Sequence, residues 1–104
     1  MNDIAERDWK YLARIKGELL NALCARLNAM ALVILSDSSL SQHERFLRLY
    51  RHLLESDQTV ADCFNDWRRS NILDKLLMLR RHQLLMDEHM SRLSAHTQER
   101  LGLR

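Results

Sequence analysis

The sequence predicts an all-α fold, an antiparallel helical bundle of about four helices, and three observations support this. The 104 residues include no proline and only two glycines, Gly17 and Gly102, so the residue types that most often interrupt helices are nearly absent. Apolar residues recur at intervals of three and four over most of the chain, the spacing of one helix face. A content of 46% hydrophobic and 29% charged residues is typical of a folded chain, and the length fits a single helical domain, 1–104.

The first predicted helix is long, from about Asp3 to Leu35. Its core-facing stripe consists of Ile4, Leu12, Ile15, Leu19, Ala22, Leu23, Leu27, Met30, Val33 and Ile34. From Cys24 to Leu35 nearly every residue is apolar, and a helix that is apolar all round must be covered on all sides. This cover is expected from the second and third helices or from a second copy of the chain, and we expect a dimer. Arg26, inside the stripe, is expected to pair with a carboxylate or to extend to solvent.

Two shorter helices are predicted next. Ser36–Leu40 is a predicted turn, and Ser41 with Glu44 forms a capping box that starts a helix over Gln42–Glu55. This helix is expected to turn Phe46, Leu47, Tyr50, Leu53 and Leu54 inward and Arg45, Arg48 and Arg51 outward. Ser56–Asp57 predicts another turn, followed by a third helix over about Gln58–Arg69.

The fourth predicted helix is long and begins after Ser70–Asn71. It runs to about Arg100, and Gly102 is well placed to end it. The first and fourth helices would each be about 45 Å long, whereas a globular chain of this size has a radius of gyration of about 13 Å. Either these helices are broken or a second subunit covers their exposed lengths, and we expect an antiparallel bundle that dimerises.

Three histidines of the fourth predicted helix, His82, His89 and His96, recur every seven residues. They fall on one side of the helix, but about 10.5 Å apart, too far to share a metal ion. We weigh a pH-sensitive seam against the simpler reading that histidine suits the edge of an apolar stripe. Cys24 and Cys63 belong to no CxxC pair, so reduced, core-facing thiols are expected, with a disulfide as the alternative.

Residues 60–69 resemble the recognition helix of homeodomains, with Phe64, Arg68 and Arg69 at matching positions. The resemblance implies a helix that contacts DNA bases and phosphates. However, the position at which that family has its base-reading asparagine holds Asp66, whose charge opposes phosphate. An amphipathic helix that faces the core accounts for the same residues.

Several functional classes find no support. The sequence has no GxGxxG, GxxxxGK or GxSxG motif and no Glu-x-x-His, so we predict no cofactor, no metal site and no catalytic residue. The net charge of +2 is spread evenly along the chain. The charged N-terminal segment is unlike a secretory signal, and Leu27–Ser36, the longest apolar stretch without charge, is far shorter than a membrane span. We therefore expect a cytoplasmic protein without membrane contact.

The function predicted from these observations is that of a small cytoplasmic helical protein-interaction module, adaptor or regulatory in kind, which forms a homodimer and binds an unidentified protein partner. The candidate partner-binding residues are Arg45, Arg48, Arg51, Arg68, Arg69, Arg80 and Arg81. The alternative is a nucleic-acid-binding regulator that uses the same arginines, which salt dependence would distinguish. An enzyme comes third.

Overall fold

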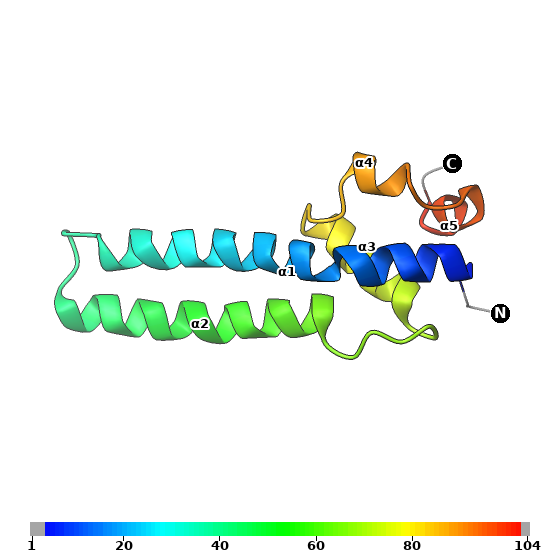
Figure 1. The fold of residues 1–104 in the computed structure, drawn as a ribbon. Coiled ribbons are helices and arrows are strands. Elements are labelled where there is room, and N and C mark those ends of the chain that lie inside the picture. Colours follow the sequence, from blue (N-terminus) through cyan, green and yellow to red (C-terminus); the bar gives the residue numbers. More distant parts are fainter. Residues whose placement is uncertain (1–3, 103–104) are drawn as a thin grey trace.

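The computed structural model describes residues 4–102, and it confirms that the fold is all-helical over these residues. The helices number five rather than four: α1 (Glu6–Leu35), α2 (Gln42–Phe64), α3 (Ile72–Arg81), α4 (Asp87–Met90) and α5 (Ala95–Arg100). Helices α1 and α2 form an antiparallel hairpin, and α3, α4 and α5 gather at the end that holds the start of α1 (Figure 1). The molecule measures 53 × 23 × 22 Å with a radius of gyration of 16.8 Å, against about 13 Å for a globular chain of this length.

The turn between α1 and α2 is held by local hydrogen bonds that the sequence makes easy to recognise. The Asp37 carboxylate accepts from the backbone N–H of Ser39 at 3.0 Å. Ser41 and Glu44 form the predicted capping box, with reciprocal bonds of 3.0 and 3.1 Å. The Arg45 side chain, predicted to face outward, is half-buried and donates to the Asp37 carbonyl oxygen at 2.8 Å. The predicted start of α2 is therefore confirmed, whereas Arg45 fastens the turn.

The face of α2 that packs on α1 differs from the predicted face. The five apolar residues expected to point inward are 41–63% exposed: Phe46, Leu47, Tyr50, Leu53 and Leu54. His52 and Ser56 are buried instead, and His52 Nε2 donates to the Leu27 carbonyl oxygen at 2.9 Å. Because Ser56 lies on this buried side, the predicted turn at Ser56–Asp57 does not form, and α2 continues without a break to Phe64.

The prediction of a long fourth helix is also wrong, because this part of the chain forms three separate helices, α3, α4 and α5. The first break follows α3, where Gln83 adopts a left-handed backbone conformation with φ of 57°, a conformation that ordinarily selects glycine. The turn buries Leu84 and Leu85 in the core. A second break precedes α5, which Ser94 caps. Gly102 follows α5 with φ of 79°, in agreement with its predicted role as a C-terminal stop.

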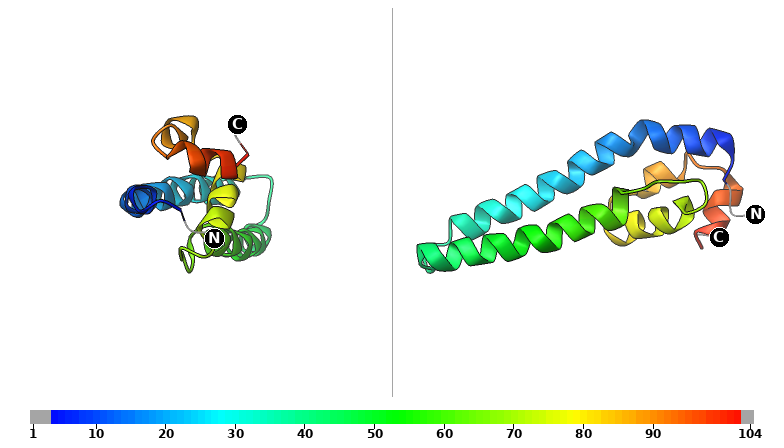
Figure 2. Two further views of the ribbon diagram at one scale, coloured as in Figure 1. Left: turned by 90° about the vertical axis from the view of Figure 1, so that its right-hand side faces the viewer. Right: turned by 90° about the horizontal axis from the view of Figure 1, so that it is seen from below.

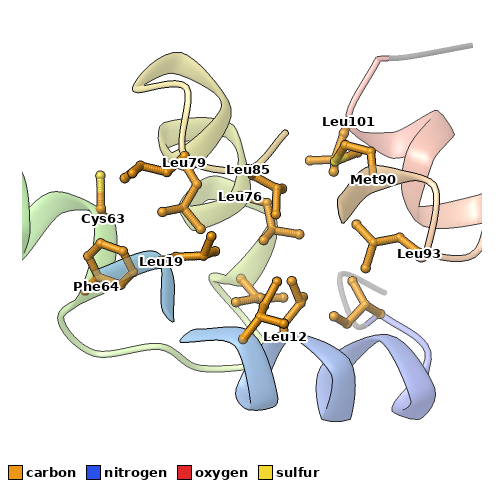
Figure 3. Close-up of a cluster of buried hydrophobic side chains, with 14 of the residues drawn as sticks. Leu12, Leu19, Cys63, Phe64, Leu76, Leu79, Leu85, Met90, Leu93 and Leu101 are labelled. Carbon is orange, nitrogen blue, oxygen red and sulfur yellow. The ribbon is translucent and has the colours of Figure 1, made fainter. Parts of the chain in front are cut away.

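The hydrophobic core occupies the end of the molecule that holds α3–α5 (Figure 3). Its buried members are Ile4, Leu12, Ile15, Leu19, Leu23, Cys63, Phe64, Ile72, Leu76, Leu79, Leu84, Leu85, Met90, Leu93 and Leu101. Figure 3 shows Leu12 and Leu19 of α1 beside Leu76 and Leu79 of α3. The buried stripe of α1 stops at Leu23, so the second half of the hairpin projects beyond the core.

Candidate functional site

The projecting half of the hairpin exposes nine large apolar side chains, which together we call the distal hairpin surface. Its members are Met30, Leu32, Val33, Leu35, Phe46, Leu47, Tyr50, Leu53 and Leu54, each 41–71% exposed. Among the residues that the structure describes, the only other exposed large hydrophobic side chains are Leu77 and Met86. Exposed large apolar side chains, where they gather, are typical of interaction sites. The distal hairpin surface is therefore the feature of this fold best suited to binding.

On α1, Met30 of this surface continues the stripe that the core buries. Leu23 is 4% exposed, whereas Met30, seven residues later on the same side of the helix, is 53% exposed. Arg26 marks the boundary, because its guanidinium donates to the carbonyl oxygens of His82 and Gln83 at 2.7 Å each. These carbonyls lie at the C-terminal end of α3, where a cation is favoured, so Arg26 binds carbonyls rather than the expected carboxylate.

On α2 the apolar residues of the surface form one face, which we call the α2 outer face: Phe46, Leu47, Tyr50, Leu53 and Leu54. Arg48 and Arg51 lie on a different side of this helix, where they line a shallow cavity of about 350 Å³ with Ile34, His52 and Glu55. The predicted outward direction of Arg48 and Arg51 agrees with their exposure. The two arginines and the α2 outer face are thus separate features of the helix.

The other candidate arginines lie at the core end of the molecule and most are paired within the chain. The ion pairs are Arg68–Asp66 at 2.8 Å, Arg69–Glu6 at 3.0 Å and Arg80–Asp87 at 3.1 Å. Arg69 also stacks over Trp9, with the guanidinium carbon 5.3 Å from the ring centroid. Arg81 contacts the Met78 sulfur at 3.7 Å. The seven candidate arginines therefore belong to several elements and do not line one surface.

The segment that resembles a homeodomain recognition helix is not a single helix. Helix α2 ends at Phe64, and Asp66 has φ of 59° in the turn that follows. Phe64 is buried and stacks on Trp67 with ring centroids 6.1 Å apart, while Lys16 lies 4.9 Å from the centroid of the Trp67 ring. These aromatic residues anchor the end of α2 in the core. The sequence resemblance does not extend to the local structure.

The heptad-spaced histidines are separated by the breaks in the predicted fourth helix. His82 follows the last turn of α3, His89 lies in α4, and His96 lies in α5. The Nδ1 atom of His89 accepts from the backbone N–H of Met86 at 2.9 Å, a local bond at the start of α4. A seam along one helix, on which the pH-sensitive interpretation depended, is not present.

The described residues give little basis for catalysis or metal binding. Ser56 Oγ lies 3.5 Å from the His52 ring nitrogens, but both residues are buried between the two helices of the hairpin. Cys24 and Cys63 are both free; Cys63 is buried as expected, and Cys24 is half-buried. Burial, with the nearby Asp62 charge, raises the pKa of the Cys63 thiol and disfavours a thiolate. Within residues 4–102, no three His, Cys, Asp or Glu side chains are grouped to hold a metal ion.

A buried carboxylate that the sequence analysis missed joins the first helix to the last. Asp8 in α1 is 0% exposed and accepts from Ser94 N at 3.0 Å, Ser94 Oγ at 2.7 Å and Thr97 Oγ1 at 2.6 Å. Burial opposes ionisation, but the hydrogen bonds from Ser94 and Thr97, with the Arg7 charge, outweigh it and hold the pKa of Asp8 below its ordinary value. The Ser-x-x-Thr spacing at the start of α5 signals a helix cap, but nothing local links it to Asp8.

No protein-family model, curated protein or solved structure matches the sequence. Helix α1 is long and apolar enough, by length and composition, to cross a membrane, a test that core helices of soluble proteins and N-terminal signal sequences also pass. The distal hairpin surface is therefore the feature from which a function is proposed.

Proposed function

We propose that this protein is a small helical protein-interaction module, adaptor or regulatory in kind, that binds through the distal hairpin surface. The observation that carries the proposal is the position of nine exposed apolar side chains on the part of the hairpin that extends beyond the core. Burying one large apolar side chain contributes about 1.5–3 kcal/mol, so covering several of them provides the free energy for a stable complex.

We further propose that the protein is a cytoplasmic homodimer. The hairpin brings together only two helices at its distal end, and α2 covers α1 there on one side. Two hairpins packed through their distal surfaces would cover apolar side chains that each hairpin alone leaves exposed.

The arginines give weaker support to the rival proposal, a nucleic-acid-binding regulator. Arg68, Arg69 and Arg80 are paired with carboxylates, so phosphate would have to displace these partners. A phosphate-binding protein loses affinity steeply as salt rises. We expect the purified chain to show no salt-sensitive affinity for a 20-base-pair duplex, measured by fluorescence anisotropy between 50 and 200 mM salt.

Site-specific photocrosslinking tests the proposal. A photoreactive phenylalanine analogue replaces Leu53, on the α2 outer face, or Arg51, on another side of the same helix, in the tagged full-length chain inside cells. We expect nuclease-resistant protein adducts from position 53 and far fewer from position 51. Adducts that depend on nucleic acid would favour the rival, and equal labelling at both positions, or none, would contradict an interaction role for this surface.

A further inference from the structure

We infer that the partner on the α2 outer face is a second copy of this chain, packed antiparallel about a two-fold axis beside Tyr50. This inference rests on the proposed function, because it takes the distal hairpin surface as a binding surface. It goes further by naming the occupant and the register in which that occupant binds. Both follow from an arrangement of residues on α2.

The exposed large apolar residues of α2 are placed symmetrically about Tyr50. Leu47 and Leu53 lie three residues on either side of it, and Phe46 and Leu54 lie four residues on either side. Offsets of three and four fall on the same helix face as the central residue. In an antiparallel pair centred on Tyr50, Phe46 therefore meets Leu54 of the second copy, and each apolar residue finds an apolar partner.

The same symmetry places an imidazole, which can donate a hydrogen bond, opposite a carboxylate at each end of the apolar face. His43 lies seven residues before Tyr50 and Asp57 seven residues after it, and both are exposed. Among residues 4–102, neither side chain makes a hydrogen bond or ion pair. The antiparallel pair sets His43 against Asp57 of the second copy, twice per dimer. A parallel pair would oppose two Asp57 carboxylates.

A membrane surface fits this face less well. An interfacial helix keeps its basic residues at the edges of the apolar face and has no reason to place a carboxylate within it. Here Asp57 lies in line with the apolar residues, whereas Arg48 and Arg51 line a cavity elsewhere on the helix. The arrangement of charge thus favours a second copy over lipid.

The size of the face suits a small specific dimer. Phe46 is 63% exposed and Tyr50 is 57% exposed, and three leucines adjoin them. With aromatic side chains that bury about 150–250 Å² each, a symmetric pair covers on the order of 1,000 Å² in total, near the lower limit for a specific interface.

The position of the axis predicts the shape of the dimer. Tyr50 lies eight residues from the start of α2, or about 12 Å along the helix. Helices α3–α5 lie at the opposite end of the molecule and leave the hairpin end open to a partner (Figure 2). Two molecules, each 53 Å long, would therefore overlap only near their tips and form a particle roughly 80 Å long.

Disulfide trapping tests the register. Tyr50→Cys and, as the matched control, Arg51→Cys are each made in a Cys24→Ser background and oxidised mildly. A residue on the two-fold axis faces its own copy, so we expect Tyr50→Cys to give a covalent dimer at least tenfold faster than Arg51→Cys. Small-angle scattering of the parent should give a maximum dimension near that of the elongated dimer. Equal rates, or a parent that is monomeric at tens of micromolar, would overturn the inference.

Charge reversal tests the pairing of His43 with Asp57 separately from the apolar contact. We expect Asp57→Lys and His43→Glu each to weaken the dimer about threefold to tenfold in sedimentation equilibrium, and the double variant to recover most of the loss. Circular dichroism of each variant controls for folding. Independent losses that simply add would contradict the antiparallel register.

The experiments separate this inference from the proposed function. If position 53 crosslinks to a different protein while the purified chain stays monomeric, the surface binds a partner other than a second copy. If the monomer instead partitions onto phosphatidylcholine or phosphatidylserine vesicles through Leu53, lipid is the occupant and both proposals are wrong.

Discussion

Replacing Asp8 by alanine is expected to be among the most damaging single substitutions in this protein. The side chain is 0% exposed and accepts three hydrogen bonds, two from Ser94 and one from Thr97. Hydrogen bonds to a charged group contribute about 1.5–3 kcal/mol each, and donors left buried without a partner are costly. Because Ser94 Oγ and Thr97 Oγ1 lie 3.2 Å apart and can bond each other, we expect a loss of about 3–5 kcal/mol rather than the full sum.

Urea denaturation monitored by circular dichroism measures this loss, and pH identifies its cause. The pKa of Asp8 is lower in the folded protein than its unfolded value of about 3.9. The stability contributed by its ionised form is therefore fully present above about pH 4 and is lost as pH falls through the folded pKa. We expect Asp8→Asn to cost about 2 kcal/mol at pH 6, since the amide keeps an acceptor, and the gap to wild type to narrow below pH 4.

Asp87→Ala is the control, because this carboxylate is 95% exposed and its pair with Arg80 is expected to contribute less than about 1 kcal/mol. A wild-type protein and an Asp8→Ala variant with the same urea midpoint would refute the account of the buried carboxylate. A gap between wild type and Asp8→Asn that stays constant from pH 6 to pH 3 would show that the ionised form is not what stabilises the fold.

Three further predictions concern other parts of the fold. Phe64→Ala should cost about 3–5 kcal/mol in urea unfolding, because the ring is 4% exposed and stacked in the core; a loss below 1 kcal/mol would contradict this. Half-buried Cys24 should react with a thiol reagent at least tenfold faster than buried Cys63, and similar rates under native conditions would argue against the observed burial. Gln83→Gly should leave stability unchanged or raise it by about 1 kcal/mol, since glycine adopts this φ of 57° without strain; a clear fall in the thermal midpoint would refute it.

The features that were predicted correctly from the sequence are those that local signals determine. The absence of proline predicts the helical class, the Ser41–Glu44 capping box predicts the start of α2, and Gly102 predicts a C-terminal stop. Each of these signals acts within about four residues. Local chemistry therefore accounts for the correct boundaries.

The buried face of α2, the break after α3 and the partners of Asp8 are determined by tertiary contacts, which local sequence patterns do not reveal. Helix α2 has apolar residues on two sides, so periodicity alone does not say whether Tyr50 or His52 faces α1, and tertiary packing selects His52. The break after α3 uses Gln83 where glycine is usual, so it leaves no sign in the sequence. The partners of Asp8 lie 86 and 89 residues away, beyond the reach of any spacing rule.

The bonds between Asp8 and α5 also constrain the order in which the chain folds during synthesis. The hairpin pairs segments that are near in sequence, so α1 and α2 can associate as soon as α2 leaves the ribosome. The core forms later, because the Asp8 carboxylate has its hydrogen-bond donors only after residues 94 and 97 have been synthesised. Between the completion of α2 and the synthesis of α5, the nascent chain therefore consists largely of an apolar hairpin whose core side is uncovered. This is the stage at which we expect it to depend most on chaperones.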